Sequence, residues 1–283
     1  MEENTITEEV KEKGWSFKII MFWVLAFLIT AGSAYYQRIT GPTYPTSGVV
    51  SFQGKDVKYK LDRSCDTSRN AIVMLENMDP TIKGFIEYKR YKTNDDKTLV
   101  EMKNEGGILS AEFPAEKDRF YRIPAQKYEY RVLLVKDNQK SEIPSDPVVL
   151  RFKGDVPLFI LLIHVIIIFA AMLVSTRAGL EFFNKEANFK KLALWSLAIM
   201  TLGGMVMGPI VQKYAFGELW TGIPFGFDLT DNKTLIAWLA WIVAAVASFR
   251  SKNPGRWVLG AALVTLIIFS IPHSVLSGNT PTK

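Results

Sequence analysis

The chain has 283 residues, a formal net charge of +6 and a hydrophobic fraction of 48%. Its apolar residues are gathered in blocks that are almost free of charge, with the charged residues dense between them. This distribution is typical of bilayer-spanning helices rather than of one globular core. Because much of the Lys and Arg lies beside the apolar blocks, the positive charge indicates contact with anionic lipid, and it gives no reason to expect a nucleic-acid partner.

The cysteine content limits the chemistry that the chain can perform alone. Cys65 is the single cysteine, which excludes an intramolecular disulfide, a CxxC metal pair, an iron–sulfur cluster held by this chain alone and covalent haem attachment. The sequence contains no P-loop or dinucleotide-binding fingerprint. The region between the first two apolar blocks has no histidine and no recognisable nucleophile–base pair. We therefore do not expect an independent enzyme.

The N-terminal region combines a polar segment with the first apolar block. Residues 1–16 are polar and charged, and we expect them to be cytoplasmic. Residues 17–36 are long enough for a first transmembrane helix, with Trp15, Tyr35 and Tyr36 at its ends as interfacial aromatic residues. Small residues near the end of this block would also fit a signal-peptide cleavage site. The length and the flanking aromatic residues favour an uncleaved anchor.

Residues 37–155 have a different pattern and predict one extracytoplasmic β domain. Short runs with alternating apolar and polar residues are separated by turn sequences, which is typical of an antiparallel all-β sandwich of roughly seven strands. A hairpin that ends the region, with a turn at Pro144–Pro147, resembles the end of a fibronectin- or immunoglobulin-like domain. The predicted strand runs are 48–52, 71–75, 84–91, 128–135 and 148–152.

Residues 156–278 predict a four-helix membrane domain, which makes five transmembrane helices in all. The expected spans are 156–176, 191–211, 235–249 and 257–276, and a short tail of residues 279–283 follows. Lys and Arg are more frequent in the segments 11–18, 177–191 and 250–256 than in the short segments on the opposite side. The positive-inside rule then places the N-terminus inside and the β domain, the 212–234 loop and the C-terminus outside, as expected for the cytoplasmic membrane of a bacterium.

The chain has two histidines, His164 and His273, and both fall in apolar segments. The predicted topology puts both in the outer half of the membrane, and helix tilt would bring them to a similar depth. An ionisable side chain in a membrane span is a functional candidate, and neutral imidazole is a good axial ligand for haem iron. The alternative is that each histidine only forms a hydrogen bond with a neighbouring helix or water.

The outer loop of residues 212–234 is rich in aromatic residues and is interrupted by glycine and proline. A solvated loop would not carry five aromatic rings, so this loop lies on the membrane surface as an aromatic belt or covers a flat apolar ligand. Its candidate contact residues are Tyr214, Phe216, Glu218, Trp220, Phe225, Phe227, Asp228 and Asp231. The two aspartates also precede the fourth span, where helix capping is the simpler role.

Several of these segments, taken in order, resemble the haem-handling membrane proteins of cytochrome c assembly, of the CcsA, ResC and CcmC type. The resemblance covers residues 156–278. Leu162–Val165 is similar to the segment with the first external histidine, and His273-Ser274 is similar to the segment with the second. The segments that complete it are Leu202–Gly208, Tyr214–Gly217 and Phe227–Leu239, the last of which is similar to the tryptophan-rich motif.

The resemblance implies a non-covalently bound haem b, with His164 and His273 as the iron ligands and Trp220, Phe227 and Trp238 beside the porphyrin. It implies a role in cytochrome c maturation or haem handling, with lipid, haem and a protein partner such as an apocytochrome c at the extracytoplasmic domain. Two alternatives remain open. One is a cytochrome b-type electron-transfer subunit of a respiratory complex, and the other is a cofactor-free, membrane-anchored β-sandwich that acts as a scaffold or in recognition.

Overall fold

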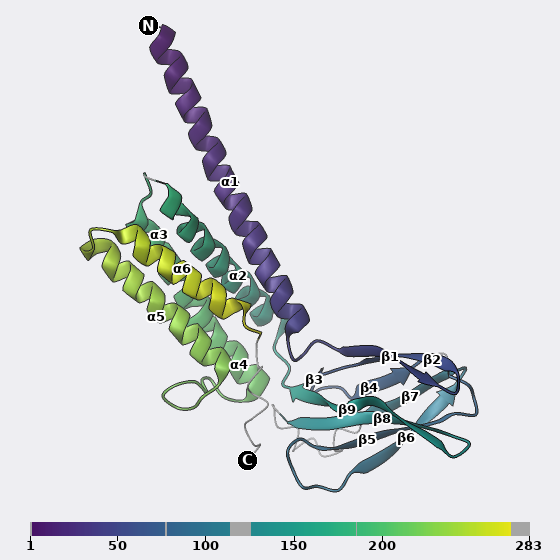
Figure 1. Ribbon diagram of the computed structural model, residues 1–283. Helices are drawn as coiled ribbons and strands as arrows, with labels where there is room; N and C mark the ends of the chain where they lie inside the picture. The colour runs from purple at the N-terminus through teal and green to yellow at the C-terminus, as the bar shows by residue number, and fades with distance from the viewer. Residues whose placement is uncertain (1, 77, 114–125, 185, 273–283) are drawn as a thin grey trace. The chain divides into compact units, whose positions relative to one another are not determined.

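The computed structural model describes residues 2–76, 78–113, 126–184 and 186–272, with side chains from residue 17 onward (Figure 1). The chain divides into two compact units. The helical unit contains the described residues up to Thr40, Leu158–Val211 and those from Leu219 onward. The β unit contains Gly41–Pro157 and Gln212–Glu218.

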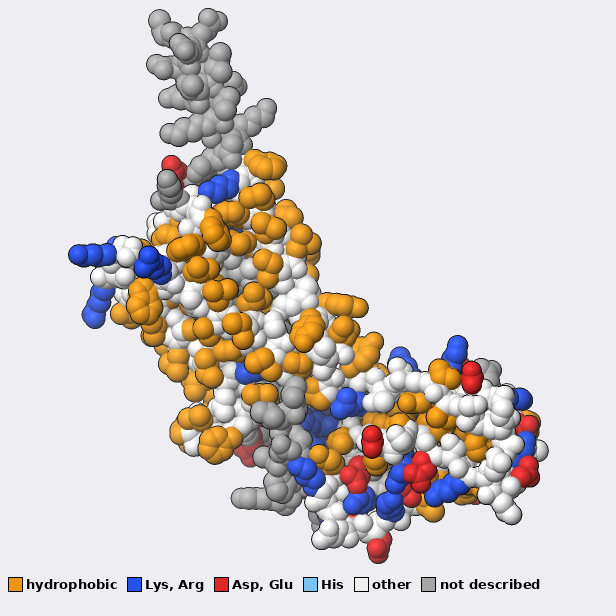
Figure 2. Space-filling view, viewed as in Figure 1, with side chains coloured by type: hydrophobic (Ala, Val, Ile, Leu, Met, Phe, Trp, Pro, Cys, Tyr) orange, Lys and Arg blue, Asp and Glu red, His pale blue; other side chains and the backbone are white. Residues whose placement is uncertain are grey.

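The helical unit is built from long apolar helices. Four helical stretches in the described part of the chain are long and apolar enough to cross a membrane: Phe17–Thr40, Leu158–Phe183, Phe189–Phe216 and Leu229–Arg250. Apolar side chains cover much of the visible face of this unit (Figure 2). The helices are α1 (Glu2–Thr40), α2 (Leu158–Leu180), η2 (Glu181–Phe183), α3 (Phe189–Met200), η3 (Thr201–Met207), α4 (Gly208–Phe216), α5 (Leu229–Arg250) and α6 (Pro254–Ser270).

The prediction of five membrane-length helices is wrong, because the last helix is too short. Pro254 lies at the start of α6, where a missing backbone N–H costs nothing. The helix has 17 residues and ends at Ser270 rather than near residue 276. The residue before a proline avoids the helical region, and Ile271, which precedes Pro272, is extended at φ −71° and ψ 123°. At about 1.5 Å per residue, α6 is shorter than the roughly 30 Å hydrocarbon layer.

The β unit is a single nine-stranded sheet, so the predicted two-sheet sandwich is also wrong. The strand order is β1-β2-β4-β7-β6-β5-β8-β9-β3. The pairs are antiparallel except for β3 and β9, which are parallel, so the sheet is mixed. The strands are β1 (Thr46–Phe52), β2 (Lys55–Leu61), β3 (Ser64–Asp66), β4 (Ala71–Leu75), β5 (Lys83–Arg90), β6 (Thr98–Glu105), β7 (Ile108–Phe113), β8 (Lys127–Lys136) and β9 (Gln139–Lys153).

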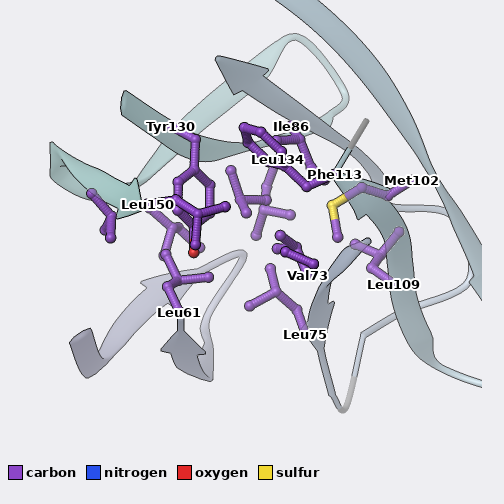
Figure 3. Close-up of a cluster of buried hydrophobic side chains, with 14 of the residues drawn as sticks. Leu61, Val73, Leu75, Ile86, Met102, Leu109, Phe113, Tyr130, Leu134 and Leu150 are labelled. Carbon is purple, nitrogen blue, oxygen red and sulfur yellow. The ribbon is translucent and has the colours of Figure 1, made fainter. Parts of the chain in front are cut away.

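The sheet is continuous because β6 is shared between its two halves. Residues Thr98–Met102 pair with β5, and residues Lys103–Glu105 pair with β7. One strand therefore belongs to both halves, and the sheet curls around one core instead of separating into two layers. Figure 3 shows that core, in which Tyr130 lies among aliphatic side chains from several strands. The Tyr130 hydroxyl, fully buried, donates a hydrogen bond to the Asp62 carbonyl at 2.7 Å.

The last hairpin exists, but its turn lies earlier than predicted. Asp137 and Asn138 connect β8 to β9, both with positive φ angles of 46° and 63°, as two-residue hairpin turns require. The segment Pro144–Pro147, predicted as the turn, lies inside β9. Its turn-forming residues are accommodated by an irregularity in the β8–β9 register between Tyr130 and Val132.

Candidate functional site

His164 lies on α2 and is partly buried in the helical unit. Its imidazole interacts with the backbone of Gly203 on η3. The Nδ1 atom is buried and has no hydrogen-bond partner among the described residues. A buried polar atom without a partner is uncommon and calls for an explanation, such as a bound group or a role outside folding. His164 is therefore the focus of the candidate site.

The segment opposite His164 is a π-helix. In η3 the helical turn is wider than in an α-helix, and the Gly208 N–H donates to the Gly203 carbonyl five residues earlier. A Cβ atom on Gly203 would lie 3.1 Å from Cγ2 of Ile167 on α2. A Cβ atom on Gly204 would lie 2.7 Å from Cγ2 of Thr234 on α5. The two glycines thus allow α2 and α5 to approach η3 closely.

Trp238 contacts the same π-helical segment from α5. Its indole Nε1 donates to Oγ1 of Thr201, the first residue of η3, at 2.9 Å. The Thr201 hydroxyl in turn donates to the Leu197 carbonyl at 2.8 Å. The structure therefore brings two of the predicted haem-binding residues, His164 and Trp238, to one π-helical segment from two different helices.

The second predicted ligand, His273, lies outside the described residues. The described chain before it is held by Lys233, which is 5% exposed and whose Nζ donates to the Ile271 carbonyl at 2.5 Å. Further along, Trp241 Nε1 donates to Thr265 Oγ1 at 2.9 Å, so α5 and α6 run antiparallel. The end of α6 therefore lies beside the start of α5, and the hydrogen bond from Lys233 links the two.

The two aspartates at the start of α5 have different roles. Asp228 is the N-cap, since its side chain accepts hydrogen bonds from the backbone N–H groups of Thr230 and Asp231. Asp231 instead is 5% exposed and points back to the preceding loop. Its Oδ2 accepts from the Thr221 N–H at 2.6 Å and from the Gly222 N–H at 3.0 Å. Capping was predicted for both residues, and only Asp228 has that role.

The aromatic residues of the loop differ in exposure. Phe225 is 82% exposed and Phe227 is 88% exposed, so neither ring packs on the described residues. Trp220 is partly buried, and its Nε1 donates to the Ile223 carbonyl within the same loop at 3.1 Å. Three other predicted contacts, Tyr214, Phe216 and Glu218, belong to the β unit.

A buried ion pair in the helical unit was missed by the sequence analysis, which used Arg177 only to assign orientation. An Nη2–Oε1 distance of 2.5 Å joins Arg177 to Glu181, and the two side chains are 6% and 9% exposed. The guanidinium also lies over the rings of Phe22 and Trp23 on α1, at 5.2 and 5.4 Å from their centroids. The four-residue spacing of opposite charges at the end of an apolar helix was the available signal.

The chemistry of His164 fits an axial haem ligand. Haem iron takes a neutral imidazole nitrogen, and a backbone carbonyl beside the ring is a common group for fixing its orientation. Because Gly203 and Gly204 hold α2 and α5 close to η3, a porphyrin would have to approach His164 from outside this three-helix contact. No family model matches the chain, and no curated protein or solved structure is significantly similar to it.

Proposed function

We propose that the chain is an integral membrane protein that binds haem b non-covalently through His164 and His273, close to the outer leaflet, for cytochrome c maturation or haem handling. The observation that carries the proposal is the buried Nδ1 of His164, which has no hydrogen-bond partner among the described residues and lies in the apolar stretch of α2 that precedes Ser175. Histidines in membrane-spanning segments are costly to bury and commonly serve function. Bound haem would supply an iron centre capable of one-electron chemistry.

A series of contacts supports pairing His164 with a ligand from the C-terminal segment. His164 interacts with Gly203, and the adjacent Gly204 packs against Thr234. Lys233, the neighbour of Thr234, holds the carbonyl of Ile271. These contacts link the described chain at Ile271 to the π-helical segment beside His164 through α5.

The protein's own residues would have separate tasks in this proposal. His164 would bind from α2, and the Gly203 backbone would orient its imidazole ring. Trp238 would stay bound to Thr201 and contribute an apolar surface. The N-terminus would lie inside and the β unit outside the cytoplasmic membrane of a bacterium, where the β unit would recruit an apocytochrome c or another assembly or redox subunit.

The test is a reduced-minus-oxidised absorbance spectrum of the detergent-purified full chain from haem-replete cells, with pyridine haemochrome quantification. We expect a low-spin b-type signal near one haem per chain. His164→Ala and His273→Ala should each lower the haem content. Gly260→Ala, on α6, should leave it unchanged, because the added Cβ meets no neighbouring side chain or packed helix of the described structure within 4 Å. Full haem retention in the double histidine variant would disprove ligation by this pair.

The close packing at Gly203 and Gly204 favours a second candidate, a cofactor-free membrane protein whose β unit serves as a scaffold or in recognition. A colourless preparation from the same cells would support it. If haem is present, a redox titration and the identity of co-purifying subunits separate haem handling from the third reading, an electron-transfer subunit of a respiratory complex.

A further inference from the structure

The loop between α4 and α5 carries a group of exposed apolar side chains. Residues 219–227 contain no Asp, Glu, Lys or Arg. Leu219 and Ile223 are 54% and 51% exposed, and Phe225 and Phe227 are exposed more strongly still. The loop lies at the lower left of Figure 1, and apolar side chains gather there in Figure 2. Exposed apolar groups of this size mark a contact with a membrane or another molecule.

Six backbone N–H groups among residues 221–228 donate hydrogen bonds within the loop or to the start of α5. Asp231 accepts from two N–H groups, of Thr221 and Gly222, and Oδ1 of Asn232 accepts from the Ile223 N–H at 2.8 Å. The N–H groups of residues 225 and 226 both donate to the Gly222 carbonyl at 2.9 Å, and that of residue 228 donates to the Thr221 carbonyl at 3.0 Å. Position 224 is proline, which has no N–H to satisfy.

The conformation of the loop is also fixed by two glycines. A Cβ on Gly226 would lie 2.4 Å from the Thr221 carbonyl oxygen, and a Cβ on Gly222 would lie 2.6 Å from Cβ of Asp231. Both distances are too short for any other residue. The loop is thus held in one compact shape in which its polar groups face one another and its apolar side chains face outward.

We infer that residues 219–227 form a preorganised wedge that inserts into the interfacial layer of the bilayer, with the lipid as its partner. Water would satisfy open backbone groups in a solvated loop, so internal satisfaction of these donors is needed only where water is scarce. The wedge leads directly into α5, whose side chains Ile236, Leu239 and Val243 are themselves about half exposed on a membrane-length helix. Lipid contact thus continues from the helix to the loop. This inference does not depend on haem binding.

The inference is tested by spin labelling the full chain in nanodiscs of zwitterionic lipid. Cys65 is buried and is replaced by Ala, so one introduced cysteine carries the label. Ile223→Cys keeps both phenylalanines, and Phe225→Cys probes the tip. Val49→Cys, at an exposed site of β1, serves as the aqueous reference, and Phe27→Cys, at an exposed site of the membrane-length helix α1, serves as the lipid reference.

The readout is the ratio of accessibility to oxygen, which partitions into lipid, over accessibility to a water-soluble nickel chelate. We expect the ratio at positions 223 and 225 to be several-fold above that at position 49 and to approach that at position 27. A ratio equal to that at position 49 would overturn the inference in favour of a solvated loop. Exclusion of both reagents would overturn it in favour of a loop covered by protein or by a bound ligand.

A second variant tests the role of Asp231 as a positioning residue. Asp231→Ala, combined with the label at position 223, removes the acceptor for Thr221 and Gly222, so we expect a more mobile label and a loss of the oxygen preference. Asp231→Asn keeps one acceptor oxygen and should largely restore both. An unchanged spectrum in the Ala variant would show that Asp231 does not hold the wedge in shape.

Discussion

The guanidinium of Arg177 and the carboxylate of Glu181 form an ion pair one helical turn apart, almost sealed from solvent. Glu181 also accepts a hydrogen bond from the Asn184 side-chain amide at 2.6 Å. Arg177 keeps its Nε and Nη1 without hydrogen-bond partners among the described residues. The aromatic rings of Phe22 and Trp23 on α1 cover the guanidinium face. The pair therefore joins the end of α2 to α1.

We expect Glu181→Gln to destabilise the helical unit by about 3–5 kcal/mol, because it leaves the buried Arg177 charge without its counter-ion. Thermal unfolding in detergent, followed by circular dichroism, measures the change. The double variant Arg177→Met, Glu181→Leu removes both charges and should recover most of the loss. If the single variant were as stable as the parent protein, the ion pair would not contribute to the stability of the helical unit.

Gly203→Ala should weaken the packing of η3 on α2 by about 1–3 kcal/mol, since the added methyl group meets both the side chain of Ile167 and the backbone nitrogen of Ile168, at 3.1 and 3.3 Å. The matched control is Gly260→Ala, where the methyl group meets nothing within 4 Å. That helical substitution should be neutral or stabilising by about 0.5–1 kcal/mol. The two variants are compared by thermal unfolding in the same detergent, and equal shifts would contradict the steric argument.

Asp79 should titrate at unusually low pH. Hydrogen bonds from the Thr81 side chain and backbone, and then from Lys136, hold the pKa of this carboxyl far below its ordinary value of 3.8. Because the folded-state pKa is lowered, the associated stability is present above about pH 4 and is lost as the pH falls toward the folded-state pKa. Carboxyl ¹³C NMR titration of the full chain measures it, with Asp79→Asn to assign the signal.

Thr81→Val removes the hydroxyl donor but keeps the backbone donor, so the pKa of Asp79 should rise part of the way to its ordinary value. Lys136→Met should also raise it, because this change removes both a hydrogen bond and a nearby positive charge. An unchanged pKa of Asp79 in either variant would contradict the assigned causes.

Tyr130→Phe should destabilise the β unit by about 1–2 kcal/mol, because the Asp62 carbonyl loses its buried donor while the ring still fills the core. Burial also raises the pKa of the Tyr130 hydroxyl, so we expect this tyrosine to resist ionisation in an alkaline ultraviolet titration of the folded chain. Tyr44→Phe, at a 45% exposed position, is the control and should change neither quantity. A loss of stability in the control comparable to that in Tyr130→Phe would remove the special role of the buried hydroxyl.

The sequence predicted the elements whose signal is local. Apolar blocks located the four long helical stretches, with ends that differ by up to seven residues, and alternating patterns located β1, β4, β5 and β8. The end of α6 was missed although Pro272 marked it, because the apolar pattern continued past the proline. The double pairing of β6 was invisible, since a strand's pattern gives its faces but not its neighbours. Asp231 was predicted as a cap because the sequence shows its place near the start of α5. The sequence does not show that this side chain accepts a hydrogen bond from the Thr221 N–H, ten residues earlier.

Because β6 pairs with strands on both sides, the two halves of the sheet depend on each other for their stability. Removal of the strands on either side would leave part of β6 without its hydrogen-bond partners. Disruption of the strands on either side would therefore also destabilise β6 and, through it, the core that both halves share. The unit should therefore unravel in a single step under mechanical load, without a surviving half.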